Sequence, residues 1–153
     1  MKHVVILLLS VLLLSSCCTK STLEGGKTYI FPKGKKVTNN NFTGNVWLKM
    51  LCQDEQLLTI SIGNVTFEPG ARTKWHLHPG GQIILVTEGI GYYQEKGQMK
   101  KILHKGDVIK CPPNVEHWHG ASPDSHLVHL AISDNDKGAV MWLEPVTDEE
   151  FYK

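Results

Sequence analysis

Two pairs of histidines in this sequence have the spacing of side chains that share one face of a β-strand. His76 and His78 stand in the segment WHLHPGGQ, and His117 and His119 stand in EHWHGA. Residues two apart on a strand point to the same side. Several imidazoles inside a small apolar domain each need a hydrogen-bond partner or stay neutral, whereas a divalent metal ion accepts a lone pair from each neutral ring. The spacing therefore favours a metal site.

Two further polar residues can join these pairs. His129, in SHLVHLAI, shares its strand face with Leu127 and Ala131, and Gln82 starts a new strand after the Pro-Gly-Gly turn at 79–81. Each assignment has a plain alternative: one His-x-His pair arises easily by chance, and His129 alone can be an ordinary core histidine. Several histidines with a shared orientation favour a metal site more strongly than any one pair does.

The elements that must position these residues are short strands. LLTISIGNVTF (57–67) is rich in β-branched residues without a helical period, and QIILVTEGIGYYQEKGQMKKIL (82–103) predicts two strands joined by a turn at 95–98. Only the C-terminal TDEEFYK predicts a helical turn, with Thr147 as its cap. Many short strands at this spacing predict an all-β sandwich or barrel.

Length and charge restrict the function. A chain of 153 residues can bury one ordinary core, and its 16 basic residues nearly balance 15 acidic ones without a basic stripe, which argues against nucleic acid as a partner. Once Cys17 is set aside, an odd number of cysteines remains, namely Cys18, Cys52 and Cys111, so no disulfide framework is predicted. Cys52 and Cys111 are expected to be buried free thiols.

The N-terminal segment predicts export. Its apolar run, from Val4 to Leu14, is too short to span a bilayer, and Leu-Ser-Ser-Cys at 14–17 resembles the bacterial lipobox. Residues 1–16 are predicted to be a lipoprotein signal peptide, Cys17 the lipidated residue, 17–36 a tether and 37–153 the folded domain. An ordinary signal peptide is the alternative. The lipid is expected to hold the domain at the cell envelope, on the periplasmic side, with the outer membrane favoured because no aspartate follows Cys17.

Two longer segments resemble the motifs of the cupin superfamily. PGARTKWHLHPGGQIILVTEG is similar to the first cupin motif, whose positions are occupied by Gly70, His76, His78, Gln82 and Gly89. GDVIKCPPNVEHWHGA is similar to the second, with Gly106, Pro112, His117, and Asn114 where glycine is usual. The resemblance implies a cupin β-barrel, jelly-roll-like with two antiparallel sheets and commonly a homodimer. It implies His76, His78, Gln82 and His117 as metal ligands.

Over about residues 40–152 the chain looks like small bacterial cupins that include manganese-dependent hydroxynitrile lyases and cupins associated with carboxymuconolactone decarboxylases. The segments FTGNV, EHWHGASPDSHLVHLAI and VMWLEPVTDEEFYK carry this resemblance. In that subgroup glutamine is the usual fourth ligand, as Gln82 is here. The resemblance implies His129 as general base, and His119 is the second candidate. It favours manganese, although imidazole also accepts iron, zinc and nickel.

Three neutral imidazoles and one amide leave a divalent ion its full double charge, which suits Lewis-acid chemistry on a small oxygen-bearing organic molecule. A metal-dependent lyase similar to the hydroxynitrile lyases is the favoured function. An iron-dependent dioxygenase and a non-catalytic module that binds a metal or small ligand are the alternatives.

Three residues near the motifs are expected to be structural. Arg72 is predicted to pair with nearby Glu68, and contact with an anionic substrate is the alternative. Trp75 and Trp118 point away from the histidines by strand alternation, which predicts that they pack against other apolar residues.

Overall fold

The computed structural model describes residues 22–24, 27–53 and 58–153 of one chain. The predicted leader at 1–16 and the lipidation site Cys17 lie outside the described residues. The leader and the lipid anchor therefore stay predictions. The homodimer also stays a prediction, because the structure describes a single chain. Within the predicted tether, the structure describes three short strands, of which the third is paired with the folded domain.

Nearly all regular structure is antiparallel strand, which confirms the predicted all-β class. Two strands, β1 (Thr22–Glu24) and β2 (Lys27–Tyr29), pair with each other. The others form one curled ladder: β3 (Lys35–Lys36), β4 (Phe42–Thr43), β5 (Val46–Gln53), β6 (Ile60–Phe67), β7 (Arg72–Thr73), β8 (His76–Leu77), β9 (Gln82–Glu95), β10 (Lys101–His104), β11 (Val108–Cys111), β12 (His117–Ala121), β13 (Leu127–Asp134) and β14 (Met141–Trp142).

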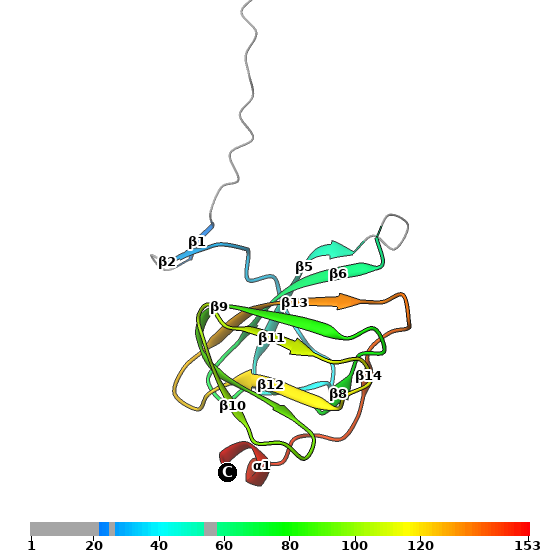
Figure 1. Ribbon diagram of the computed structural model, residues 1–153. Helices are drawn as coiled ribbons and strands as arrows, with labels where there is room; N and C mark the ends of the chain where they lie inside the picture. The colour runs from blue at the N-terminus through cyan, green and yellow to red at the C-terminus, as the bar shows by residue number, and fades with distance from the viewer. Residues whose placement is uncertain (1–21, 25–26, 54–57) are drawn as a thin grey trace, which may run out of the picture.

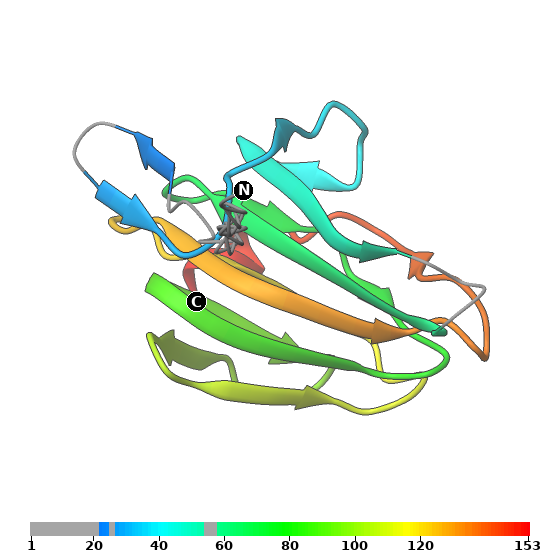
Figure 2. The same ribbon diagram turned by 90° about the horizontal axis from the view of Figure 1, so that it is seen from above.

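The long strand β9 belongs to both halves of the barrel (Figure 1). Its first half pairs with β11 and β13, and its second half pairs with β10 and β12. Figure 2 shows β13, in orange, between the green strands β6 and β9, in agreement with the pairing. The two pairing regions meet near Gly89, which has φ +83. A Cβ there would lie 1.9 Å from the carbonyl oxygen of His126, so only glycine fits.

The main core fills the barrel between these two halves. Its buried apolar side chains are Val46, Val65, Phe67, Ala71, Ile84, Val86, Tyr93, Leu103, Cys111, Ala121 and Leu127. They come from several strands. Val65 and Phe67 in β6, and Ile84 and Val86 in β9, are two residues apart, which is the period expected of a buried strand face. The polar residues of the candidate site are buried as well, so the site is built into the core.

The C-terminal segment closes the outer side of β8 and β12. Helix α1 (Asp148–Tyr152) is capped by the Thr147 side chain, which accepts a hydrogen bond from the Glu150 amide, as the sequence predicted. Phe151 of α1 is buried in a second cluster with Trp75, Trp118 and Val146. Within the described ranges, α1 is the only helix, and nothing helical there is long and apolar enough to cross a membrane.

The turn that leads into β12 has a left-handed residue. Asn114 has φ +61, and its backbone N–H donates a hydrogen bond to the backbone carbonyl oxygen of His78 at 3.0 Å. This explains why asparagine can stand where the resembling motif has glycine, because both residues tolerate a positive φ.

Asn114→Ala is expected to lower the free energy of unfolding by about 1 kcal/mol, because alanine adopts the left-handed conformation at a steric cost. Asn114→Gly should retain the wild-type stability to within roughly 0.5 kcal/mol. Urea unfolding followed by circular dichroism measures both. Asn40→Ala is the matched control, since Asn40 is exposed and is not among the described residues with positive φ. Equal stability of the Asn114→Ala variant and the wild type would contradict this account of the turn.

Candidate metal centre

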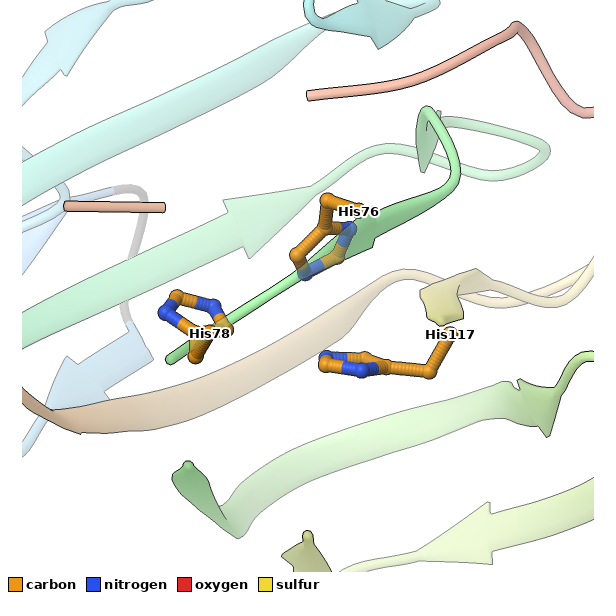
Figure 3. A group of neighbouring side chains, drawn as sticks. All are labelled: His76, His78 and His117. Atoms are coloured by element: carbon orange, nitrogen blue, oxygen red, sulfur yellow. The ribbon is translucent and has the colours of Figure 1, made fainter. Parts of the chain in front are cut away.

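Three histidines converge where β8 and β12 lie side by side. His76 is in β8, His78 follows that strand, and His117, the first residue of β12, is paired directly with His76. Paired residues on antiparallel strands point to the same face. The ligand nitrogens of the three rings all lie within 4.8 Å of one another, and the rings surround a common space (Figure 3). The structure thus brings together the three histidines that the sequence predicted as ligands.

Backbone hydrogen bonds fix the tautomers of two of these rings. Nδ1 of His76 lies 2.9 Å from the Lys74 carbonyl oxygen, and Nδ1 of His117 lies 2.9 Å from that of Val115. A carbonyl can only accept, so each Nδ1 donates and each Nε2 keeps its lone pair. The buried Nε2 atoms of His78 and His117 have no hydrogen-bond partner among the described residues. Orphaned imidazole nitrogens with oriented rings are the arrangement that a divalent ion needs.

Burial keeps the three imidazoles neutral. It lowers the pKa of His78 to about 4, with a further contribution from the neighbouring His117. Burial and the same neighbour hold the pKa of His76 well below its usual value. The pKa of His117 is also lowered by burial, although the Val115 carbonyl and Glu95 oppose the shift. All three rings are therefore in the form that donates a lone pair at neutral pH.

Gln82, the predicted fourth ligand, lines the same cavity as His76 and His78. It is the first residue of β9, it is buried, and its Nε2 lies 3.2 Å from Oγ of Ser133. The chain thus supplies an uncharged oxygen donor beside three uncharged nitrogen donors. The residues present fit a divalent cation, and coordination by Gln82 remains a prediction.

The two predicted catalytic histidines form a buried pair. Nε2 of His129 lies 3.2 Å from Nδ1 of His119, and burial lowers the pKa of both rings, that of His129 to about 4. His119 lines the cavity, and its ring centroid is 5.2 Å from that of His76. His129 is fully buried and stacks on Phe67, with ring centroids 5.5 Å apart. It is on the inner face, as alternation predicted, but behind His119 and outside the cavity lining.

The cavity next to the histidines has a volume of about 200 Å³. Its walls are mainly apolar, and its polar groups are imidazoles, one amide and hydroxyls. Among the residues that the structure describes, no charged side chain lines the cavity. The lining residues are Phe42, Leu48, Met50, Ser61, Gly63, Val65, Thr73, His76, His78, Gln82, His119, Ala131, Ser133, Val140 and Trp142. Such a space suits a small neutral molecule.

The tryptophans beside the motifs are packing residues, as predicted. Trp75 is 2% exposed and Trp118 is fully buried, and both belong to the outer cluster beneath α1. Their histidine neighbours point to the opposite side of the strands.

The predicted partner of Arg72 was wrong. Nη2 of Arg72 lies 2.6 Å from a carboxylate oxygen of Asp148 and also donates to the Val146 carbonyl oxygen. Glu68 instead accepts a hydrogen bond from Asn45. The physical reason is that Arg72 lies under the C-terminal segment, with its guanidinium 4.5 Å from the Phe151 ring centroid. Arg72 therefore holds that segment and does not line the cavity.

Sequence reasoning missed several contributors to the site. Ser133, Ser61 and Trp142 line the cavity, and Phe67 supports His129. Strand alternation could have found Ser133, which is four residues after His129 on the same face of β13. The position of Trp142 depends on the pairing of β14 with β8, for which the local sequence has no signal.

Comparisons with known proteins agree with this architecture. A family model described as "Cupin domain" matches residues 63–133. The (R)-mandelonitrile lyase of Granulicella tundricola is 46% identical over 111 residues, which cover 72% of this chain and 85% of that protein.

Solved structures show the same fold. A cupin-like protein from Thermotoga maritima is 54% identical with a TM-score of 0.78, covering 80% of this chain and 94% of that one. A cupin-2 domain from Rhodospirillum rubrum has a TM-score of 0.63 at 16% identity, covering 82% of this chain and 84% of that one, and it shows likeness of fold alone.

Proposed function

The chain belongs to the cupin family, and we propose that it is a metal-dependent carbon–carbon lyase that cleaves a small neutral hydroxynitrile into a carbonyl compound and hydrogen cyanide. The observation that carries the proposal is that His119 lines the same uncharged cavity as His76 and His78, two members of the three-histidine cluster. A proton carrier and a candidate metal centre thus meet one substrate space. The 46% identity to a mandelonitrile lyase supports this choice of reaction.

His76, His78, His117 and Gln82 would hold the ion, for which we propose manganese. When bound, a divalent ion supplies a Lewis acid that draws electron density from an oxygen of the substrate. Because all four donors are neutral, the protein cancels none of the ion's charge through a carboxylate. Iron, zinc and nickel have the same donor preferences and are the alternatives that a metal analysis separates.

The chain's own residues account for the proton transfer. His119 is neutral because burial lowers its pKa, so it can accept the proton of the substrate hydroxyl. The electron pair left by that proton forms the carbonyl double bond as the carbon–carbon bond to cyanide breaks. Cyanide leaves with the pair of the broken bond and takes the proton from His119, which regenerates the neutral imidazole. His129 holds His119 through the 3.2 Å hydrogen bond.

The cavity favours an uncharged substrate with an apolar substituent. The lining includes four large apolar side chains, Phe42, Leu48, Met50 and Trp142. A charged substrate would lose its hydration there without gaining an ion pair from the lining residues that the structure describes. Aryl and branched alkyl hydroxynitriles meet these requirements.

The direct test is an assay of manganese-loaded protein with mandelonitrile. The expected result is benzaldehyde and cyanide at a rate well above the buffer background, with loss of activity after a chelator and recovery after manganese is added back. No benzaldehyde above background with any of the four metals would overturn the proposal. Oxygen uptake with a catechol and iron would support a dioxygenase instead, and binding without turnover would support a binding module.

A further inference from the structure

A row of polar side chains crosses the sheet beside the candidate metal centre. Gln82 in β9 is paired with Cys111 of β11 on one side and with Ser133 of β13 on the other. Ser133 is in turn paired with Ser61 of β6. Since paired residues point to the same face, these four side chains stand next to one another on the inner side of the sheet. Three of them, Gln82, Ser133 and Ser61, line the cavity.

An amide ligand has an orientation problem that imidazole does not have. Rotation of the terminal group of Gln82 by half a turn exchanges its carbonyl oxygen, which has lone pairs, for its NH₂ group, which has none to offer. Coordination therefore requires a neighbour that favours one orientation. In the structure, Nε2 of Gln82 donates to Oγ of Ser133 at 3.2 Å, and each residue is 7% exposed. A buried hydrogen bond of this kind is costly to break, because the NH₂ group would lose its partner.

The neighbour on the other side of Gln82 is a weaker partner. Sγ of Cys111 lies 4.0 Å from Oε1 of Gln82, and a thiol is a weak hydrogen-bond donor. The amide oxygen of Gln82 therefore keeps a lone pair that it can donate to a metal ion. Of the two flanking residues, Ser133 makes the shorter contact and is the one that binds the NH₂ group.

We propose that Ser133 is a positioning residue that binds the NH₂ group of Gln82 and so keeps the amide oxygen available to the metal ion. The inference rests on the metal site of the proposed function. Groups that orient a metal ligand typically contribute 10–100-fold to affinity, so the expected effect of removing the hydroxyl is of about that size.

The experiment measures manganese affinity of the metal-free full chain, by titration with manganese alone and detection of free manganese by electron paramagnetic resonance. Ser133→Ala is expected to bind manganese about 10–100-fold more weakly, and Ser133→Thr, which keeps a hydroxyl, should recover most of the affinity. Ser61→Ala is the matched control, because Ser61 lines the same cavity one strand further from Gln82. Wild-type affinity of Ser133→Ala, or an equal loss in Ser61→Ala, would overturn the proposal.

A double-mutant cycle tests whether Ser133 acts through Gln82. Once Gln82→Ala has removed the amide, adding Ser133→Ala should not weaken manganese binding further. A further loss in the double variant would show an independent role and contradict the inference. Manganese affinity and mandelonitrile cleavage test separate proposals. If the affinities change as expected but the protein does not cleave mandelonitrile, the proposed reaction is refuted and the positioning role of Ser133 stands.

Discussion

His117→Ala is expected to abolish manganese binding at micromolar metal and to reduce mandelonitrile cleavage to background. His117 is fully buried, its Nδ1 is tied to the Val115 carbonyl, and its Nε2 faces the other two imidazoles. Removing an orienting group alone typically costs 10–100-fold in affinity, so loss of a ligand should cost more than about 100-fold. Metal content after purification without a chelator and the benzaldehyde assay measure the two effects.

Two further variants make this result interpretable. His117→Gln fills much of the space of the imidazole, so it separates loss of the ligand from loss of packing. His104→Ala removes a histidine whose side chain is 63% exposed and which lies outside the cavity lining, so metal content and rate should match those of the wild type. If His117→Ala retained a full equivalent of manganese, the three-histidine site would be wrong.

His119→Ala is expected to retain manganese and to lose about 10²–10⁴-fold in kcat, the usual contribution of a positioned proton carrier. His119 is the imidazole of the buried pair that lines the cavity. Metal content should remain near one equivalent because His119 is not one of the three converging ligands. Steady-state kinetics with mandelonitrile, together with metal analysis of the same sample, provide the measurement.

His129→Ala distinguishes the two members of the pair. If His129 only holds His119, its removal should cost less than removal of His119, and it should have little effect in a protein that already carries His119→Ala. The opposite order, with near-normal turnover in His119→Ala and severe loss in His129→Ala, would assign the proton transfer to His129, as the family resemblance implies. His126→Ala serves as the control, because His126 is half-buried against Glu88 and away from the cavity.

Strand alternation explains why much of the site was predictable. The period of a strand is two, so His76 with His78 and His117 with His119 had to share faces once the segments were strands. The resemblance to the two cupin motifs then implied that His76, His78 and His117 meet, and the structure places these three histidines together. The packing of Trp75 and Trp118 followed from the same rule.

Strand alternation does not reveal how deeply a side chain is buried or which residues far away in the sequence it contacts. His129 was correctly placed on an inner face, yet its burial behind His119 depends on Phe67, 62 positions earlier in the numbering, and on the curvature of the whole barrel. The pairing of Arg72 with Asp148, 76 residues away, depends on where the C-terminal segment packs. Short separation in sequence favoured Glu68, but tertiary packing decided the contact.

The shared strand β9 has a consequence for how the domain opens. Because its two halves are hydrogen-bonded into both sides of the barrel, opening either side breaks hydrogen bonds of β9. Amide protons in the middle of β9 should therefore exchange with solvent deuterium only when the entire domain unfolds. An ion held by Gln82 and His117 would join the start of β9 to β12, so its binding energy would slow exchange across the barrel and not in one loop.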